Sequence, residues 1–287
     1  MPINFQIERT GNEYFARASS DGLRFRVGRR VPYLGNIGLF NSAGSGPLAF
    51  AASDFAASHG FWADFIEPTA ICEGRSFLTL NSYDSAGFTF GFGQFAAHVP
   101  DGDFVRAFRA LLARPETDDY FPHLELAGGR IQRVTDAGLA PLESATSTEA
   151  LMRYLNPTLD EVEDAEVIAA AKLMHWATNH PGAREIQVNT MVASYRNFMA
   201  RADKRVSIDG RPADQCLVIA DILHHGRGGK MTWPLVAQAL ASSNPLANLI
   251  AIGAPQWDGR KATLRKAIAA RPQLQAKRWS RAAGDFV

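Results

Sequence analysis

The chain has 287 residues, of which 46% are hydrophobic and 21% charged, and its 30 basic residues nearly balance its 29 acidic ones. Such a length and composition predict a soluble globular protein with a sizeable core. The net charge of +1 argues against sequence-independent binding of nucleic acid, which needs a large positive excess. No run approaches the ~20 apolar residues that a spanning helix needs, so no membrane span is expected.

The N-terminal residues 1–47 predict a β-rich extension to the main domain. Residues 5–8 and 23–27 alternate apolar and polar side chains, a pattern typical of strands with one buried face. Turns are expected at four glycines that follow, namely Gly35, Gly38, Gly44 and Gly46.

The remainder, residues 48–287, is predicted to form one mostly α-helical domain. A helix over 47–69 leads into a small β-hairpin over 73–95. A helix over 103–113 begins at an Asp and keeps its apolar side chains on one face, and the segment 115–145 after it is predicted to be loop-rich. Further helices are expected over 148–155, 159–177, 184–202, 213–223, 233–240 and 245–252. The predicted fold class is therefore α+β, mostly helical, with a small hairpin sheet and the β-rich extension.

One carboxylate, Glu73, stands where an apolar helical run gives way to the predicted hairpin. Its sequence neighbours Ile71, Cys72 and Gly74 are uncharged. Burial beside apolar groups disfavours an ionised carboxylate, and a general acid must hold its proton near neutral pH. The next acid, Asp84, lies in a polar turn where water and hydroxyl groups keep a carboxylate ionised. Two carboxyl groups in such different environments are what glycosidic cleavage requires.

The second strand of the hairpin, residues 88–94, alternates three phenylalanines with Thr89, Gly91 and Gly93. With a period of two, the phenylalanines face the core, while the threonine and the glycines line the opposite face and Gln94 ends the strand. Glycine inside a strand usually marks the close approach of a ligand or another backbone. We therefore interpret this face as the floor of a sugar cleft.

This ordered set of residues resembles the phage-type lysozymes and the wider lysozyme superfamily. Those proteins share a Glu-Gly at a helix end, an Asp in the hairpin and a strand of the form Thr-x-Gly-x-Gly-His. The chain has Glu73-Gly74, Asp84 and Thr89-Phe-Gly-Phe-Gly-Gln94, with a longer interval between the two acids and Gln94 in place of the histidine. The resemblance implies that Glu73 is the catalytic acid, Asp84 the second carboxylate and Thr89 the residue that holds the nucleophilic water. Residues 214–240 resemble a phage-lysozyme core helix more loosely.

Four further residues, Tyr83, Gly91, Gln94 and His225, are expected to contact the substrate. His225 follows another histidine at a predicted helix end, where an interaction with the helix dipole is the alternative interpretation. A zinc site needs several ligands at fixed spacing, and no such set is visible in the sequence. We therefore expect neither a metal nor another cofactor.

The resemblance implies hydrolysis of β-1,4 linkages between the amino sugars of peptidoglycan by a monomeric enzyme. A chitosanase or chitinase activity on the same scaffold stays open, since residues 85–91 also resemble a chitosanase hairpin. A non-catalytic wall-binding or phage-structural module is the alternative from another class. Because the N-terminus lacks the basic start and apolar run of a Sec signal, we expect synthesis in the cytoplasm. A holin or a dedicated export machine would then give access to the cell wall, as for an endolysin.

Overall fold

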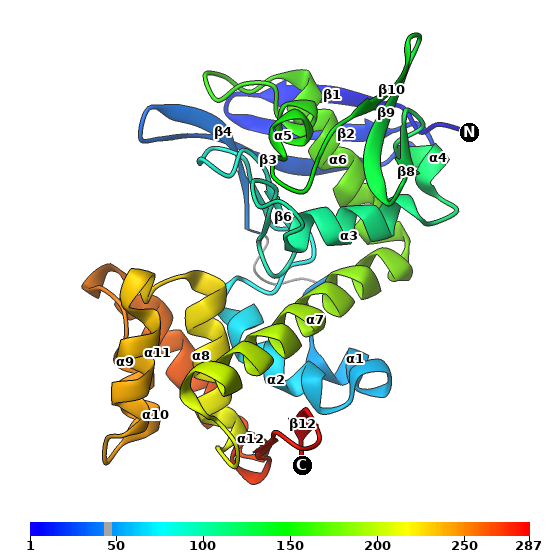
Figure 1. The fold of residues 1–287 in the computed structure, drawn as a ribbon. Coiled ribbons are helices and arrows are strands. Elements are labelled where there is room, and N and C mark those ends of the chain that lie inside the picture. The colour runs from blue at the N-terminus through cyan, green and yellow to red at the C-terminus, as the bar shows by residue number, and fades with distance from the viewer. Residues whose placement is uncertain (43–47) are drawn as a thin grey trace. The chain divides into compact units, whose positions relative to one another are not determined.

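The computed structural model describes residues 1–42 and 48–287, which belong to two compact units. The first unit comprises Met1–Ala49 and Gly74–Thr190, and the second comprises Phe50–Glu73 and Met191–Val287. Each unit is therefore built from two separate stretches of the chain, as the colours of Figure 1 show. No helix in the described residues is both long enough and apolar enough to cross a membrane.

A seven-stranded antiparallel sheet organises the first unit, with the strands in sequence order. Its strands are β1 (Phe5–Thr10), β2 (Glu13–Ala18), β3 (Arg24–Tyr33), β4 (Asn36–Asn41), β5 (Leu80–Asn81), β6 (Thr89–Phe90) and β7 (Phe95–Ala96). Helix α6 (Asp164–Asn179) packs against β1, β2 and β3. In β2 the buried Tyr14, Ala16 and Ala18 alternate with more exposed residues, as expected for a strand with one covered face.

Shorter elements complete the first unit. They are α3 (Asp103–Leu112), α4 (Thr117–Tyr120), α5 (Glu149–Leu155) and a second sheet of β8 (Leu124–Ala127), β9 (Arg130–Thr135) and β10 (Gly138–Pro141). The expectation of a loop-rich segment over 115–145 is thus wrong. Gly128 and Gly129 both have positive φ, 60° and 73°, and so form the two-residue turn that joins β8 to β9.

The second unit is mostly helical. It contains α1 (Ala52–His59), α2 (Phe61–Cys72), α8 (Ala213–His225), η1 (Gly229–Met231), α9 (Thr232–Leu240), α10 (Pro245–Ala251), η2 (Pro255–Trp257), α11 (Asp258–Ala269), α12 (Gln273–Ala276) and the hairpin of β11 (Trp279–Ser280) and β12 (Asp285–Phe286). Helix α7 (Pro181–Val206) begins in the first unit and ends in the second. The Phe286 ring contacts Phe65, Phe61 and Trp62 of α2, with ring centroids 4.7, 5.2 and 5.3 Å apart, so the hairpin joins the α2 core.

The mixed α+β class and the β-rich N-terminal region are confirmed. The domain boundary expected at residue 47, between an extension and a main domain over 48–287, does not match the two units. The N-terminal strands belong to the same sheet as the predicted hairpin, because Phe40 of β4 pairs with Asn81 of β5. Residue 47 itself and the turns predicted at Gly44 and Gly46 lie outside the described residues.

Gly38 lies inside β4, whereas the sequence predicts a turn there. An ideal Cβ at Gly38 would lie 2.7 Å from backbone atoms of Ser82 and Tyr83, so glycine is needed for a close approach of two backbones. The turn expected at Gly35 is confirmed, because Gly35 has a φ of 91° between β3 and β4.

We expect Gly38→Ala to lower the free energy of unfolding by about 1–3 kcal/mol, because its Cβ has no room without a backbone shift. Gly259→Ala in α11 is the control: Gly259 has nothing within 4 Å of an ideal Cβ, and alanine favours helix. The free energies would come from urea unfolding followed by circular dichroism. Equal stability of Gly38→Ala and the wild type would contradict the close approach.

Candidate functional site

A cavity of about 620 Å³ lies at the edge of the first unit's sheet. Four residues that the sequence singles out, Tyr83, Asp84, Thr89 and Gln94, line it. The other lining residues come from the turn between β3 and β4, from β5, from the loop after it, and from β7 and the chain that follows it: Tyr33, Leu34, Asn36, Asn81, Ser85, Ala86, Ala96 and His98. The cavity therefore gathers amide, hydroxyl, imidazole, phenol and carboxylate groups at one place.

The Asp84 carboxylate is held by a tight turn of the loop between β5 and β6. The backbone N–H of Ala86 donates to Asp84 Oδ1 at 2.9 Å, and the Asn81 side-chain amide donates to Oδ2 at 3.0 Å. The N–H of Gly87 donates to the Asp84 carbonyl at 2.9 Å. An Asp that caps its own turn in this way has a fixed position and keeps lone pairs for a ligand.

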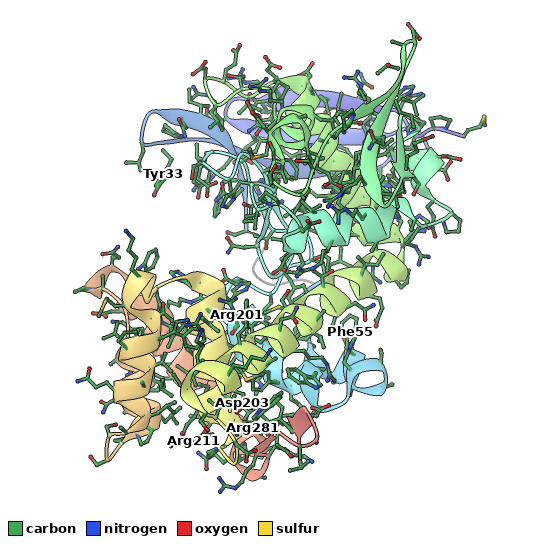
Figure 2. All side chains as sticks on the ribbon, viewed as in Figure 1. Tyr33, Phe55, Arg201, Asp203, Arg211 and Arg281 are labelled. Carbon is green, nitrogen blue, oxygen red and sulfur yellow. The ribbon has the colours of Figure 1, made fainter. Side chains whose placement is uncertain are left out.

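Two tyrosine rings give the cavity an aromatic wall. The ring centroids of Tyr83 and Tyr33 are 5.3 Å apart, and Tyr33 lies at the tip of the β3–β4 hairpin (Figure 2). Burial, followed by the nearby charge of Asp84, raises the pKa of Tyr83, so its phenol stays protonated at neutral pH and can donate a hydrogen bond. A tyrosine offers both an apolar face and a polar tip, which suits a sugar ring with its hydroxyl groups.

The glycines of the predicted cleft floor make room for the protein's own side chains. Gly91 has a φ of 91°, and an ideal Cβ there would lie 2.4 Å from Gln187 Oε1. That same Oε1 accepts from the N–H of Phe92 at 3.2 Å, and the Gln187 amide donates to the Phe77 carbonyl at 3.2 Å. The structure thus gives Gly91 a packing role against α7, and Gly91 is not among the residues that line the cavity.

Thr89 and Gln94 are placed differently along this stretch. Thr89 pairs with Asn81 and Ala96 in the sheet, and its side chain is buried at the wall of the cavity. The regular strand predicted over 88–94 is shorter, because only Thr89 and Phe90 belong to β6 and the chain then turns at Gly91. Gln94 has a φ of 48° in that turn, which brings its side chain to the cavity.

The predicted acid, Glu73, ends helix α2 in the second unit. Its side chain is 9% exposed, and Glu73 Oε1 lies 2.6 Å from Arg260 Nη1 and 3.7 Å from His224 Nε2. Arg260 also binds the buried Asp221 through Nη2 at 2.6 Å, and Asp221 pairs in turn with the buried Arg227. Glu73 is thus the more exposed of the two carboxylates in a network drawn from α2, α8, the chain after α8, and α11.

The apolar setting expected for Glu73 is therefore not what surrounds it. Its sequence neighbours are uncharged, but Arg260 and His224 meet it from elements far along the chain. Burial opposes the ionisation of Asp221, yet the charges of Arg260 and Arg227 outweigh burial and hold the pKa of Asp221 below its ordinary value. The Arg260 guanidinium therefore binds two carboxylates, those of Glu73 and Asp221.

The structure favours His224 over His225 as the imidazole beside Glu73. The His225 ring packs edge-on against Trp257, with centroids 4.4 Å apart, and burial lowers the pKa of His225. Its Nδ1 has no hydrogen-bond partner within the described residues. Both histidines are in the last turn of α8, where side chains one position apart point in different directions.

The predicted catalytic residues belong to different units: Glu73 to the second, Asp84 and Thr89 to the first. Within residues 1–42 and 48–287, no group of three or more His, Cys, Asp and Glu side chains is arranged to hold a metal ion. No family model matches the chain, and no curated protein or solved structure shows significant similarity to it. The chemistry of both places therefore has to be argued from their own residues.

The ion-pair network predicts that Arg260→Met destabilises the second unit by about 3–5 kcal/mol, because the buried Asp221 and the largely buried Glu73 lose a shared cation. Arg265→Met, at an exposed position on the same helix, should change stability by less than about 0.5 kcal/mol. Thermal or urea unfolding of the two variants measures the difference. Equal losses in both variants would show that the network contributes nothing specific.

Proposed function

We propose that the protein is a glycoside hydrolase that cleaves β-1,4 linkages between amino sugars, with peptidoglycan as its substrate. Asp84 serves as the carboxylate that stabilises the oxocarbenium-like transition state or activates water. Thr89 positions that water through its hydroxyl group. The role of general acid, expected for Glu73 from the sequence, is tested by substitution below. The proposal uses no cofactor.

The observation that carries this proposal is the composition of the cavity around Asp84. A pyranose presents an apolar ring face and a rim of hydroxyl groups, and the cavity offers the matching parts. Tyr33 and Tyr83 supply ring faces, and amide groups supply both donors and acceptors. The two hydrogen bonds that fix the Asp84 carboxylate support the proposal, because a fixed negative charge can stabilise positive charge that develops on a sugar.

The part assigned to Glu73 rests on its position in the charged network. A general acid must be protonated when it acts, and the ion pair with Arg260 is made by the ionised carboxylate. Because Arg260 also serves Asp221 at the same 2.6 Å, it keeps a carboxylate partner when Glu73 takes up a proton. The imidazole of His224 also lies near this carboxylate, with Nε2 3.7 Å from Glu73 Oε1.

Chitosan is the second candidate substrate. Asp84 is the one acidic residue that lines the cavity, and the lining residues include neither Lys nor Arg. A cavity of that charge suits a neutral or cationic amino sugar. A paired assay on chitosan and on purified cell walls separates the two substrates.

Glu73→Gln is expected to lower the release of reducing ends from cell walls or chitosan by about 10²–10⁴-fold, the contribution of a general acid. Asp84→Asn should lower it as well, because the amide removes the negative charge and leaves the turn nearly intact. Glu67→Gln is the matched control: Glu67 lies on the same helix and pairs with Arg271 at 2.5 Å. It should keep its activity.

Circular dichroism would establish that each variant is folded before activity is compared. Undiminished hydrolysis by Glu73→Gln would overturn the assignment of the acid. Binding of walls by the wild type without any release of reducing ends would instead favour a non-catalytic module.

A further inference from the structure

The loop Ser82–Gly87, which carries Tyr83 and Asp84 into the cavity, is fixed at both ends by one side chain. Asn156, the residue that ends α5, donates from Nδ2 to the Ser82 carbonyl at 2.9 Å and to the Gly87 carbonyl at 2.8 Å. These two bonds hold the two ends of the loop to one side chain. We call this segment the Asp84 loop.

The start of the Asp84 loop is held a second time, by a buried carboxyl group. The Ser82 hydroxyl contacts Glu166 Oε1, and the N–H of Leu39 donates both to Ser82 Oγ at 2.7 Å and to Glu166 Oε1 at 3.2 Å. Ser82 and Glu166 are both fully buried. Helix α6, strand β4 and the Asp84 loop therefore meet at the two atoms Ser82 Oγ and Glu166 Oε1.

Glu166 lies in an environment that does not favour its charge. Its Oε2 has no hydrogen-bond partner in the described part of the chain, and no basic side chain is among the main groups that act on its pKa. Glu163, one turn earlier in the chain, adds a like charge near Glu166. The groups that face Glu166 from β4 and the Asp84 loop are an N–H and a hydroxyl, and neither titrates near neutral pH. Burial raises the pKa of Glu166 to about 7.

We propose that Glu166 and Asn156 are positioning residues for the Asp84 loop, and that the proton on Glu166 keeps the loop in the geometry that presents Asp84 and Tyr83 to the cavity. Neither residue lines the cavity, so both act through the loop. We call the contacts of Asn156 and Glu166 with the Asp84 loop the clamp. The role of the loop in hydrolysis rests on the proposed function, whereas the clamp rests on the contacts described above.

The protonation state of Glu166 determines the direction of the Ser82 hydroxyl. When Glu166 is ionised, the hydroxyl donates to it, and a buried carboxylate remains with one oxygen unpaired. When Glu166 is protonated, its O–H can donate to Ser82 Oγ, and the Ser82 hydroxyl is released toward the Leu39 carbonyl at 3.3 Å. Oε2 stays without a partner in both arrangements, but the protonated one leaves no buried charge, so it is the more stable of the two.

Amide hydrogen exchange of Ala86 and Gly87 tests the clamp without any substrate, since both N–H groups donate to Asp84. Asn156→Ala should speed their exchange on the order of tenfold, because two hydrogen bonds are lost. Between pH 6 and pH 8, after correction for intrinsic rates, exchange in the wild type should also speed up, whereas Glu166→Gln should stay protected at both pH values. Glu161→Gln, an exposed change of the same charge near α6, should follow the wild type.

Exchange in Asn156→Ala equal to that of the wild type, or the same pH response in Glu166→Gln and the wild type, would overturn the proposal. Should Asn156→Ala fail to fold, the comparison of the wild type with Glu166→Gln decides alone. The release of reducing ends is measured on the same samples, with kcat expected to fall in Asn156→Ala in parallel with loop protection. If the wild type releases no reducing ends, the proposed hydrolysis is wrong. The exchange measurements then still test the clamp by themselves.

The raised pKa also predicts how stability changes with pH. A carboxyl whose pKa is higher in the folded than in the unfolded state stabilises the fold fully at low pH, and this contribution is lost as pH rises from about 4.5 to about 7. The free energy of unfolding of the wild type should therefore fall over this window relative to that of Glu166→Gln. Urea unfolding at pH 5 and pH 8 measures the difference, and parallel curves would contradict it.

Discussion

The pairing of β4 with β5 is the constraint on which the first unit depends. It joins a meander of four N-terminal strands to the short strands that carry Asp84 and Thr89. Strands of two residues, such as β5 and β6, form too few ladder bonds to be stable by themselves. The longer neighbouring strands and the packing of α6 supply that stability, so the N-terminal region is the support of the cavity and not an appendage.

Buried charge is handled in two different ways in this protein. In the second unit Asp221 and Arg227 are fully buried, and each is paired, so the charges compensate one another. In the first unit Glu143 is likewise matched by Arg109 and Arg130. Glu166 is the contrasting case, a buried carboxyl whose contacts are hydrogen bonds to uncharged groups. Because no cation compensates its charge, Glu166 is stabilised by protonation, and its contribution to the stability of the fold therefore depends on pH.

Local pattern was sufficient to predict most helices and the first strands. The helix expected over 103–113 is α3, and those expected over 213–223 and 245–252 are α8 and α10, because the periodicity of apolar residues is a local signal. The three-stranded sheet of β8–β10 was missed, although the Gly128-Gly129 pair was a usable hairpin signal.

The candidate site could be predicted only in part. Tyr83, Asp84, Thr89 and Gln94 lie close together in the sequence and meet at the cavity, whereas Tyr33 arrives there through the register of the sheet. The partner of Glu73 is 187 residues away, at Arg260. Contacts at such separations depend on tertiary packing, which no local pattern encodes. The sequence neighbours of Glu73 therefore suggested an apolar setting that its neighbours in space do not provide.

The contact between α2 and the β11–β12 hairpin has a consequence for the order in which the molecule is made. The indole N–H of Trp62 donates to Asp285 Oδ1 across 223 residues, and Phe286 fills the same aromatic cluster. A ribosome therefore releases α2 long before its packing partner exists, while β1 to β4 can already pair with one another. The aromatic cluster of the second unit is therefore completed only when the residues of the β11–β12 hairpin have been made.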